Sequence, residues 1–247
     1  MELLVTRPRE DSEALRESLK ARGHSVVLEP LLTICPRPGA ALPQGPFQAV
    51  IVTSANAVRA LAAHGDADAL RDTPMLTVGK ASAEAALTAG FTDVESAAGD
   101  AEALLTLVMQ RLDPEGARVL YVTGSTVARD LKALMAERGF TVERAILYDA
   151  RPAASLSEDL RERLAGGRID GVLLFSPRTA RIWAGLVRSA GLAGSLGAVR
   201  HFCLSQAVRD ALDEEIGRAD IISGVAEMPD MQAMMDLIGE FDRGRDG

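Results

Sequence analysis

The sequence is poor in cysteine, histidine and aromatic residues, and each shortage excludes a class of chemistry. It holds two cysteines, Cys35 and Cys203, three histidines and 4% aromatic residues among its 247 positions. Two cysteines that form no C-x-x-C pair cannot build a disulfide framework, and the scattered histidines match no metal-ligand spacing. We therefore expect both cysteines to lie in the core, and we predict no metal site.

Long apolar runs and surplus positive charge are also missing. No stretch approaches the ~20 apolar residues of a membrane-spanning helix. The first residues have neither the basic start nor the apolar centre of a signal peptide. The net charge of −8 disfavours nucleic-acid binding, which needs a surplus of lysine and arginine. We expect a cytoplasmic protein with neither a membrane nor a nucleic-acid partner.

Short apolar runs alternate with amphipathic helical patterns along nearly the whole chain. Continuously apolar strands separated by helices predict parallel sheets covered on both faces, and therefore an α/β fold. Strands are expected at 3–6, 26–28, 49–53, 75–78, 92–96, 119–122, 142–148, 171–175, 200–204 and 219–223. Helices are expected from about 11, 55, 81, 101, 127, 156, 179, 206 and 229.

The two halves of the sequence resemble one another, which predicts a duplicated unit of ~120 residues. In each half an apolar run ending in threonine, one ending in serine and one ending in a small residue precede helices. The matched positions drift slowly in spacing, by 117, 122 and 126 residues: Thr6 with Thr123, Ser54 with Ser176, and Gly79 with Ser205.

Proline-bearing segments indicate where the chain passes between domains. Residues 36–46 and Arg151-Pro152 favour extended backbone. The connection near Asp113 is short and turn-like, as within an α/β domain. We therefore predict an inserted lobe, 36–152, and a discontinuous lobe made of 1–35 and 153–247, each with five strands.

Five motifs then occur in a characteristic order along the chain. They are Thr6-Arg7-Pro8, Val52-Thr53-Ser54-Ala55-Asn56-Ala57-Val58, Val78-Gly79 before a helix, Leu147-Tyr148, and Phe175-Ser176-Pro177. This ordered set resembles the uroporphyrinogen-III synthase family. The resemblance implies two doubly wound, flavodoxin-like parallel-sheet lobes joined by a two-stranded linker, with a cleft between them.

The same resemblance implies a function in tetrapyrrole and haem biosynthesis. The expected enzyme is a cyclising hydro-lyase that closes hydroxymethylbilane to uroporphyrinogen III, with inversion of ring D and loss of water. It would need no cofactor, and its partner would be the small-molecule substrate; we expect a monomer. Val208 departs from the family, which often has a hydroxyl residue there.

Candidate substrate-binding residues lie where the predicted strands end, because ligands of open α/β sheets bind outside the carboxyl ends of the strands. Amide groups at the helix starts that follow favour anions. Arg7, Lys80, Arg129 and Arg178 would offset the net negative charge there. The predicted substrate-binding residues at these ends are Arg7, Thr53, Ser54, Lys80, Thr123, Gly124, Ser176 and Ser205. The resemblance to the family adds Ser82, Ala207 and Val208, which lie at positions where the family is expected to contact substrate.

Tyr148 is the candidate catalytic residue, because it ends a predicted strand just before the second domain crossing. Its phenol would donate a proton to the departing hydroxyl. Two alternatives remain open. The turn at 122–126 could hold the phosphate of a flavin or another ligand, as in flavodoxin-like proteins. A two-lobed sensor that closes on a small molecule is the second.

Overall fold

The computed structural model describes residues 1–127, 129–216 and 221–243, and the chain divides into two compact units. Unit 1 comprises Met1–Thr33 and Arg151–Gly247, and unit 2 comprises Ile34–Ala150. The divisions fall two residues before each of the boundaries expected from the prolines. Independent folding of each unit stays a prediction.

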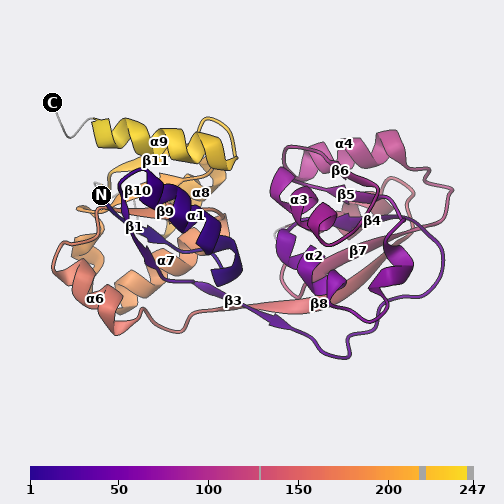
Figure 1. The fold of residues 1–247 in the computed structure, drawn as a ribbon, viewed down its shortest axis with the longest axis horizontal. Helices are drawn as coiled ribbons and strands as arrows, with labels where there is room; N and C mark the ends of the chain where they lie inside the picture. The colour runs from indigo at the N-terminus through magenta and orange to yellow at the C-terminus, as the bar shows by residue number, and fades with distance from the viewer. Residues whose placement is uncertain (128, 217–220, 244–247) are drawn as a thin grey trace. The chain divides into compact units, whose positions relative to one another are not determined.

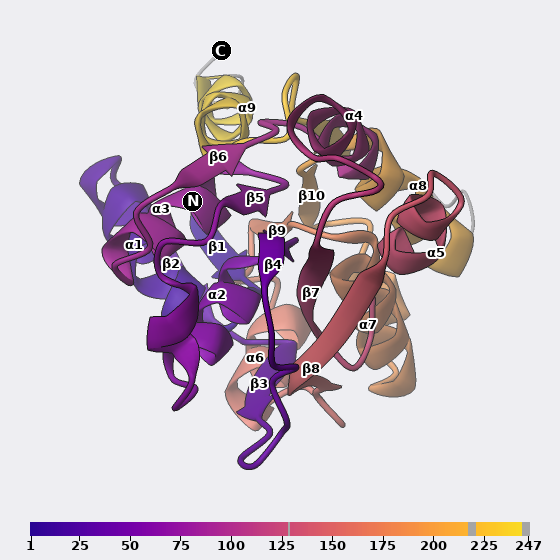
Figure 2. The ribbon, with the colours of Figure 1, turned by 90° about the vertical axis from the view of Figure 1, so that its right-hand side faces the viewer.

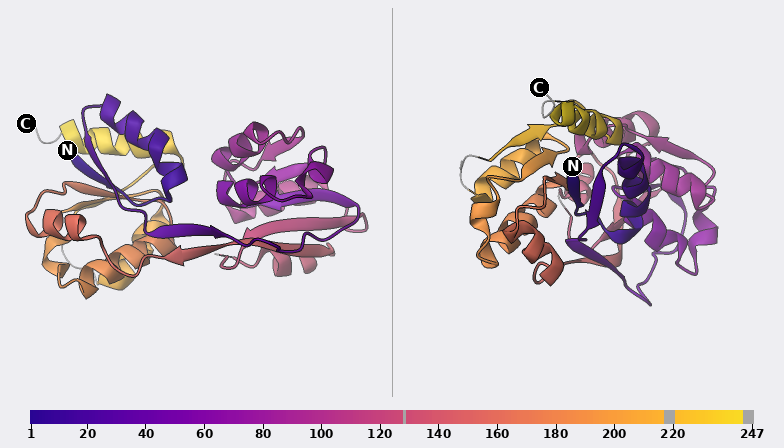
Figure 3. Two further views of the ribbon diagram at one scale, coloured as in Figure 1. Left: turned by 60° about the horizontal axis from the view of Figure 1, so that its bottom comes forward. Right: turned by 60° about the vertical axis from the view of Figure 1, so that its left-hand side comes forward.

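Unit 1 is a parallel sheet covered on both faces by helices (Figures 1 and 3). In its described residues the strand order is β11-β10-β9-β1-β2. Helices α6, α7 and α8 pack one face around Trp183, and α1 and α9 pack the other around Phe202. The strands are β1 (Glu2–Val5), β2 (Ser25–Leu28), β9 (Gly171–Leu174), β10 (Arg200–Cys203) and β11 (Ser223–Val225). The helices are α1 (Arg9–Ala21), α6 (Glu158–Ala165), α7 (Pro177–Ser189), α8 (Gln206–Ile216) and α9 (Met231–Arg243), with a short turn of 3-10 helix η2 (Ala193–Ser195).

Unit 2 has the same layered build. Its described strands follow the order β3-β8-β7-β4-β5-β6, with α2 and α3 against one face and α4 and α5 against the other (Figure 2). The strands are β3 (Leu32–Pro36), β4 (Phe47–Val52), β5 (Met75–Thr77), β6 (Val94–Ser96), β7 (Arg118–Gly124) and β8 (Val142–Pro152). The helices are α2 (Ala55–Ala62), α3 (Lys80–Thr88), α4 (Ala101–Arg111) and α5 (Leu131–Ala136), with a 3-10 turn η1 (Ala67–Leu70).

The two sheets share one topology once the halves of the chain are exchanged. Placing β7, β8, β4, β5 and β6 on β1, β2, β9, β10 and β11 reproduces the strand order β11-β10-β9-β1-β2. The sequence repeat is therefore real at the level of topology. The N-terminal half of the chain supplies β1 and β2 of unit 1 and β4 to β6 of unit 2, and the C-terminal half supplies β7 and β8 of unit 2 and β9 to β11 of unit 1.

Four expectations about elements need correction. The strand expected at 142–148 continues to Pro152 as β8, because its later residues pair with β3, so Tyr148 lies within the strand and does not end it. Unit 2 has a sixth strand, β3, because Leu32–Pro36 pairs with β8. The two segments run in opposite directions, since hydrogen bonds join Arg37 to Leu147 and Ala153 to Leu31. The helix expected from 127 begins at Leu131, capped by Asp130. The strand expected at 219–223 falls partly outside the described residues, and β11 lies at Ser223–Val225.

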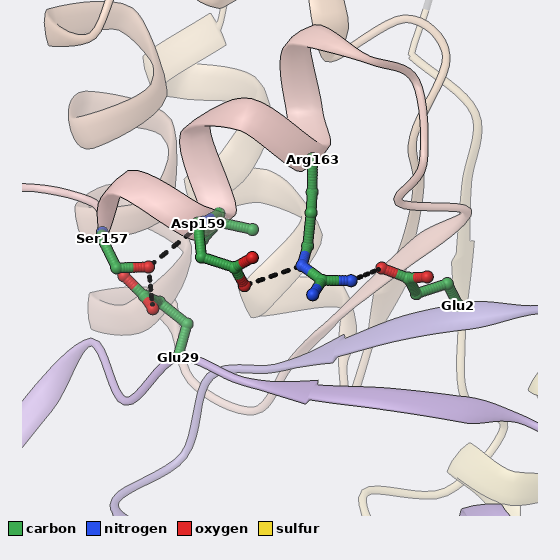
Figure 4. Close-up of polar contacts among 6 residues, drawn as sticks. Glu2, Glu29, Ser157, Asp159 and Arg163 are labelled. Atoms are coloured by element: carbon green, nitrogen blue, oxygen red, sulfur yellow. Dashed lines mark hydrogen bonds and ion pairs between the residues drawn. The ribbon is translucent and has the colours of Figure 1, made fainter.

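Helix α6 is tied to the strands of unit 1 by polar contacts (Figure 4). Ser157 caps the helix by accepting from the Leu160 amide at 3.2 Å, and its hydroxyl donates to Glu29 at 2.8 Å. Arg163 donates to Asp159 and to Glu2, each at 2.7 Å. The start of α6 is thereby held to Glu29, the residue after β2, and its end to Glu2, the first residue of β1.

Candidate functional site

Each sheet reverses its direction of winding at one pair of strands, and ligands of such sheets bind at the carboxyl ends of that pair. In unit 2 the chain proceeds outward from β4 through β5 and β6, then from β7 through β8 on the other side. The switch point lies between β4 and β7. In unit 1 the corresponding switch lies between β1 and β9.

Ser54 and Tyr148 meet at the carboxyl edge of unit 2. Ser54 follows β4, and its hydroxyl lies 3.0 Å from the phenolic oxygen of Tyr148 on β8. Tyr148 is 8% exposed and packs with the core of this unit. Two residues proposed from the sequence for different tasks are thus in direct contact.

Gly124 makes this contact possible, because β7 lies between β4 and β8 in the sheet. A Cβ atom at position 124 would lie 2.8 and 2.9 Å from atoms of the Tyr148 ring. A shift in the β7–β8 register sets Gly124 opposite Tyr148. Arg144 then holds the strand end, donating to the carbonyl oxygens of Gly124 at 2.9 Å and Ser125 at 3.3 Å.

The other predicted residues of this edge differ in exposure. Lys80 is exposed at the start of α3, whereas the Ser82 side chain in its first turn is buried. Thr53 is half-buried beside Ser54. Thr123 is buried, and its hydroxyl donates to the Gly124 carbonyl at 3.2 Å. Lys80 is therefore the predicted residue of this group with the most exposed side chain.

The equivalent edge of unit 1 holds Arg7 and Ser176. The guanidinium of Arg7 lies 4.8 Å from the centre of the Phe175 ring and 3.7 Å from the Asp11 carboxylate. Ser176 caps α7 by accepting from the Thr179 amide at 3.1 Å, and its oxygen lies 2.5 Å from the Thr179 hydroxyl. This cap occupies the place that Ser54 has in unit 2.

The start of α8 presents a smaller polar surface than expected. Ser205 is half-buried and Ala207 is exposed, while Val208 is 1% exposed and packs into the core of unit 1. The Val208 amide donates to the Ser205 carbonyl at 3.1 Å. A contact between the Val208 side chain and substrate stays a prediction, although the side chain packs into the core.

The four cations expected at the strand ends have different surroundings. Arg129 forms an ion pair with Glu102, and Arg7 is shared between Phe175 and Asp11 as above. Lys80 and Arg178 are the first and second residues of α3 and α7, respectively. The positive charge at these edges comes from a few side chains together with the amides at the helix starts.

The turn after β7 differs from a phosphate-binding loop. The carbonyls of Gly124 and Ser125 accept from Arg144, and α5 begins only at Leu131. The helix amides that would hold a phosphate therefore do not follow Gly124 directly. Within the described residues, no group of three or more histidine, cysteine or acidic side chains is placed to hold a metal. None of the helices described is both long and apolar enough to cross a membrane.

Comparisons with known proteins point to one family. A family model described as Uroporphyrinogen-III synthase HemD matches residues 13–235. The chain is 27% identical over 205 residues to the uroporphyrinogen-III synthase of Chlorobaculum parvum, covering 78% of this chain and 82% of that protein.

Solved structures share the fold. The uroporphyrinogen-III synthetase of Helicobacter pylori superposes with a TM-score of 0.66 at 17% identity, covering 97% of this chain and 99% of that one. A mutant uroporphyrinogen III synthase of Thermus thermophilus gives a TM-score of 0.60 at 18% identity, covering 100% and 99%. Since the family model spans most of the sequence, the chain belongs to the uroporphyrinogen-III synthase family.

Proposed function

We propose that this protein closes hydroxymethylbilane into uroporphyrinogen III, inverting ring D and releasing water. The observation that carries the proposal is the family match over residues 13–235. The relative from Chlorobaculum parvum bears the name of this enzyme. As a member of this family, the chain is an enzyme of tetrapyrrole synthesis, and we assign it to the hydro-lyases.

The reaction needs little general acid–base catalysis, because the bilane loses its hydroxyl readily. The C–O bond breaks, the electron pair leaves with the oxygen, and the pyrrole nitrogen supplies electrons to form an azafulvene. Unassisted closure then gives the uninverted isomer. The enzyme must hold the chain so that the substituted carbon of ring D is attacked, and orientation supplies most of the effect.

Tyr148 is the proposed general acid. Its phenol would give a proton to the departing hydroxyl oxygen, which leaves as water. A proton released from a pyrrole nitrogen would then restore the phenol, so that the cycle needs no added acid. Tyr148 lies at a carboxyl edge, where ligands of this fold class bind.

The carboxylates of the bilane are proposed to bind the helix starts and cations of the two carboxyl edges. Ser54 and Ser176 begin helices whose first amides favour anions, and Lys80 and Arg7 add charge. The net charge of −8 means that attraction must be local, since the protein as a whole repels a polyanion.

The test is the isomer formed from hydroxymethylbilane. We expect the purified protein to divert ring closure to the type III isomer, separated from type I by chromatography, and to do so after treatment with a chelator. Product that stays at the type I proportion of the uncatalysed reaction would contradict the proposal. A coloured, flavin-containing preparation would favour the flavodoxin-like alternative, and ligand-induced compaction without turnover would favour the sensor.

The cytoplasmic location and the monomeric state expected from the sequence belong to the same proposal. Sedimentation of the purified protein with and without the bilane measures its oligomeric state. A stable dimer would contradict the expectation.

A further inference from the structure

Ser54 has two hydrogen-bonding tasks at one oxygen. It caps α2 by accepting from the Ala57 amide at 3.3 Å, and it lies 3.0 Å from the phenolic oxygen of Tyr148. A serine hydroxyl offers one proton and two acceptor positions. With one acceptor position taken by the amide, Ser54 keeps a proton that it can donate to Tyr148 and one position that could accept from it.

The direction of the Ser54–Tyr148 bond decides what Tyr148 can do. If Tyr148 donated to Ser54, its proton would point at the protein and would be lost to substrate. If Ser54 donates, the Tyr148 proton is directed elsewhere, and a phenolate left after proton transfer keeps a donor. A chain of hydrogen bonds then runs from the Ala57 amide, at the positive end of α2, through Ser54 to Tyr148. Each bond in such a chain polarises and strengthens the next.

Ser176, the counterpart of Ser54 in the internal repeat, shows that the contact with Tyr148 is not needed for helix capping. Ser176 caps α7 with the same extended backbone as Ser54, but its hydroxyl meets Thr179 of its own helix. A serine in this position can therefore cap its helix without contacting a tyrosine. In unit 2 the ring of Tyr148 reaches the cap only because Gly124 leaves β7 without a side chain there.

We propose that Ser54 is a positioning residue for Tyr148, donating its hydroxyl proton to the phenolic oxygen so that Tyr148 acts as a proton donor to the substrate. Gly124 provides the passage for the ring. The inference rests on the proposed function, and it gives Ser54 a task beyond the substrate contact predicted from the sequence.

The test is a set of Ser54 variants assayed with hydroxymethylbilane in the full-length protein, with and without Tyr148→Phe. Ser54→Ala should lower kcat roughly three- to ten-fold, less than the ~10–100-fold expected for Tyr148→Phe, the low end for a general acid. Ser54→Thr, which keeps the hydroxyl, should restore the rate. In the Tyr148→Phe background, Ser54→Ala should slow the reaction no further.

Two further variants separate the bond from the cap. Ser54→Asp caps helices as well as serine does, but its carboxylate can only accept. Its kcat at saturating substrate should fall like that of Ser54→Ala. Ser157→Ala is the matched control, because Ser157 also caps a helix through the amide three residues on. It should lose comparable stability and keep the parent kcat.

The outcomes that overturn the inference are distinct from failure of the proposed function. An equal loss from Ser54→Ala in the parent protein and in the Tyr148→Phe variant would mean that Ser54 acts on substrate directly. An unchanged kcat would make it a cap alone. If the parent protein makes no type III isomer, urea unfolding of the parent, the two single variants and the double variant still tests the pair, and zero coupling between the two substitutions would refute it.

Discussion

Local partners account for several of the hydroxyl groups predicted to bind substrate. Ser54 and Ser176 accept from helix amides, and the Thr123 hydroxyl donates to the Gly124 carbonyl. Small hydroxyl residues at strand ends could be selected from the sequence, because caps and ligand sites favour the same residue types. Their partners could not, since the Ser54–Tyr148 contact depends on strand order.

Val208 illustrates the reverse case. Its selection came from the resemblance, whereas the spacing of Val208, Ala211 and Leu212 already indicates one apolar helix face. All three are buried. Helical periodicity alone therefore predicts a core position for Val208.

His201 gives a prediction about acid stability. It is fully buried beside Trp183, and burial lowers its pKa from 6.5 to about 4. The carbonyls of Ile222 and Val199 weakly favour the charged form, although neither ring nitrogen meets hydrogen-bond geometry in the part of the chain described. The unfolded chain therefore binds a proton at higher pH than the folded protein does.

We expect the stabilising contribution of neutral His201 to be complete above pH ~6.5 and lost progressively as the pH falls toward ~4, by on the order of 3 kcal/mol. Urea denaturation across this range measures the loss, and His201→Gln should flatten the slope. A slope that persists in this variant would place the sensitivity elsewhere, first at His24, whose pKa is also lowered by burial.

At the scale of elements, apolar runs predicted most strands and helices because burial on both faces leaves a continuous signal. The sequence does not indicate strand β3, because its proline-flanked residues are typical of a linker and its pairing with β8 is non-local. The sequence predicts too early a start for α5 because Val127 fits the helical period, although Asp130 supplies the cap.

The strand pair β7–β8 yields a prediction of its own. Gly124→Ala should push the Tyr148 ring away from Ser54, because the new Cβ would lie 2.8 Å from the ring. We expect a loss of about 1–3 kcal/mol in the free energy of unfolding, and a fall in kcat comparable to that of Ser54→Ala. Urea unfolding and the isomer assay measure the two effects.

Gly65→Ala is the control for the Gly124 substitution. A Cβ at Gly65 in the same unit meets nothing within 4 Å. Its stability should stay within about 1 kcal/mol of the parent, with any change favouring the folded state. Wild-type stability and turnover in Gly124→Ala would show that the ring has room to shift without losing Ser54.

At the scale of the whole molecule, the architecture follows from exchanging strands between halves of the chain. The repeat and the prolines predicted which segments belong together, because a proline-bearing linker marks a crossing and a short turn does not. The sequence could not predict that β3 and β8 pair where the chain crosses, since no local pattern encodes that partner.

A fragment of residues 34–150 should fold by itself. It contains both hydrophobic clusters of unit 2, strands β4 to β7 and all but the last two residues of β8. A fragment of residues 1–112 should not, because it carries β1 and β2 without β9 to β11. Circular dichroism and cooperative urea unfolding test both. Cooperative folding of 1–112 alone would mean that the units are tandem rather than interleaved.

The interleaved strand order also determines how late in synthesis the sheet of unit 1 can be completed. Strand β2 ends at Leu28 and β9 begins at Gly171, so 142 residues (29–170) separate them. At ~5–20 residues per second, a ribosome needs roughly 7–30 seconds to cover that distance. Throughout this interval the edge of β1 that will receive β9 stays open on the nascent chain, as a template for wrong pairing. Any lengthening of a loop in unit 2 therefore prolongs the exposure of unit 1.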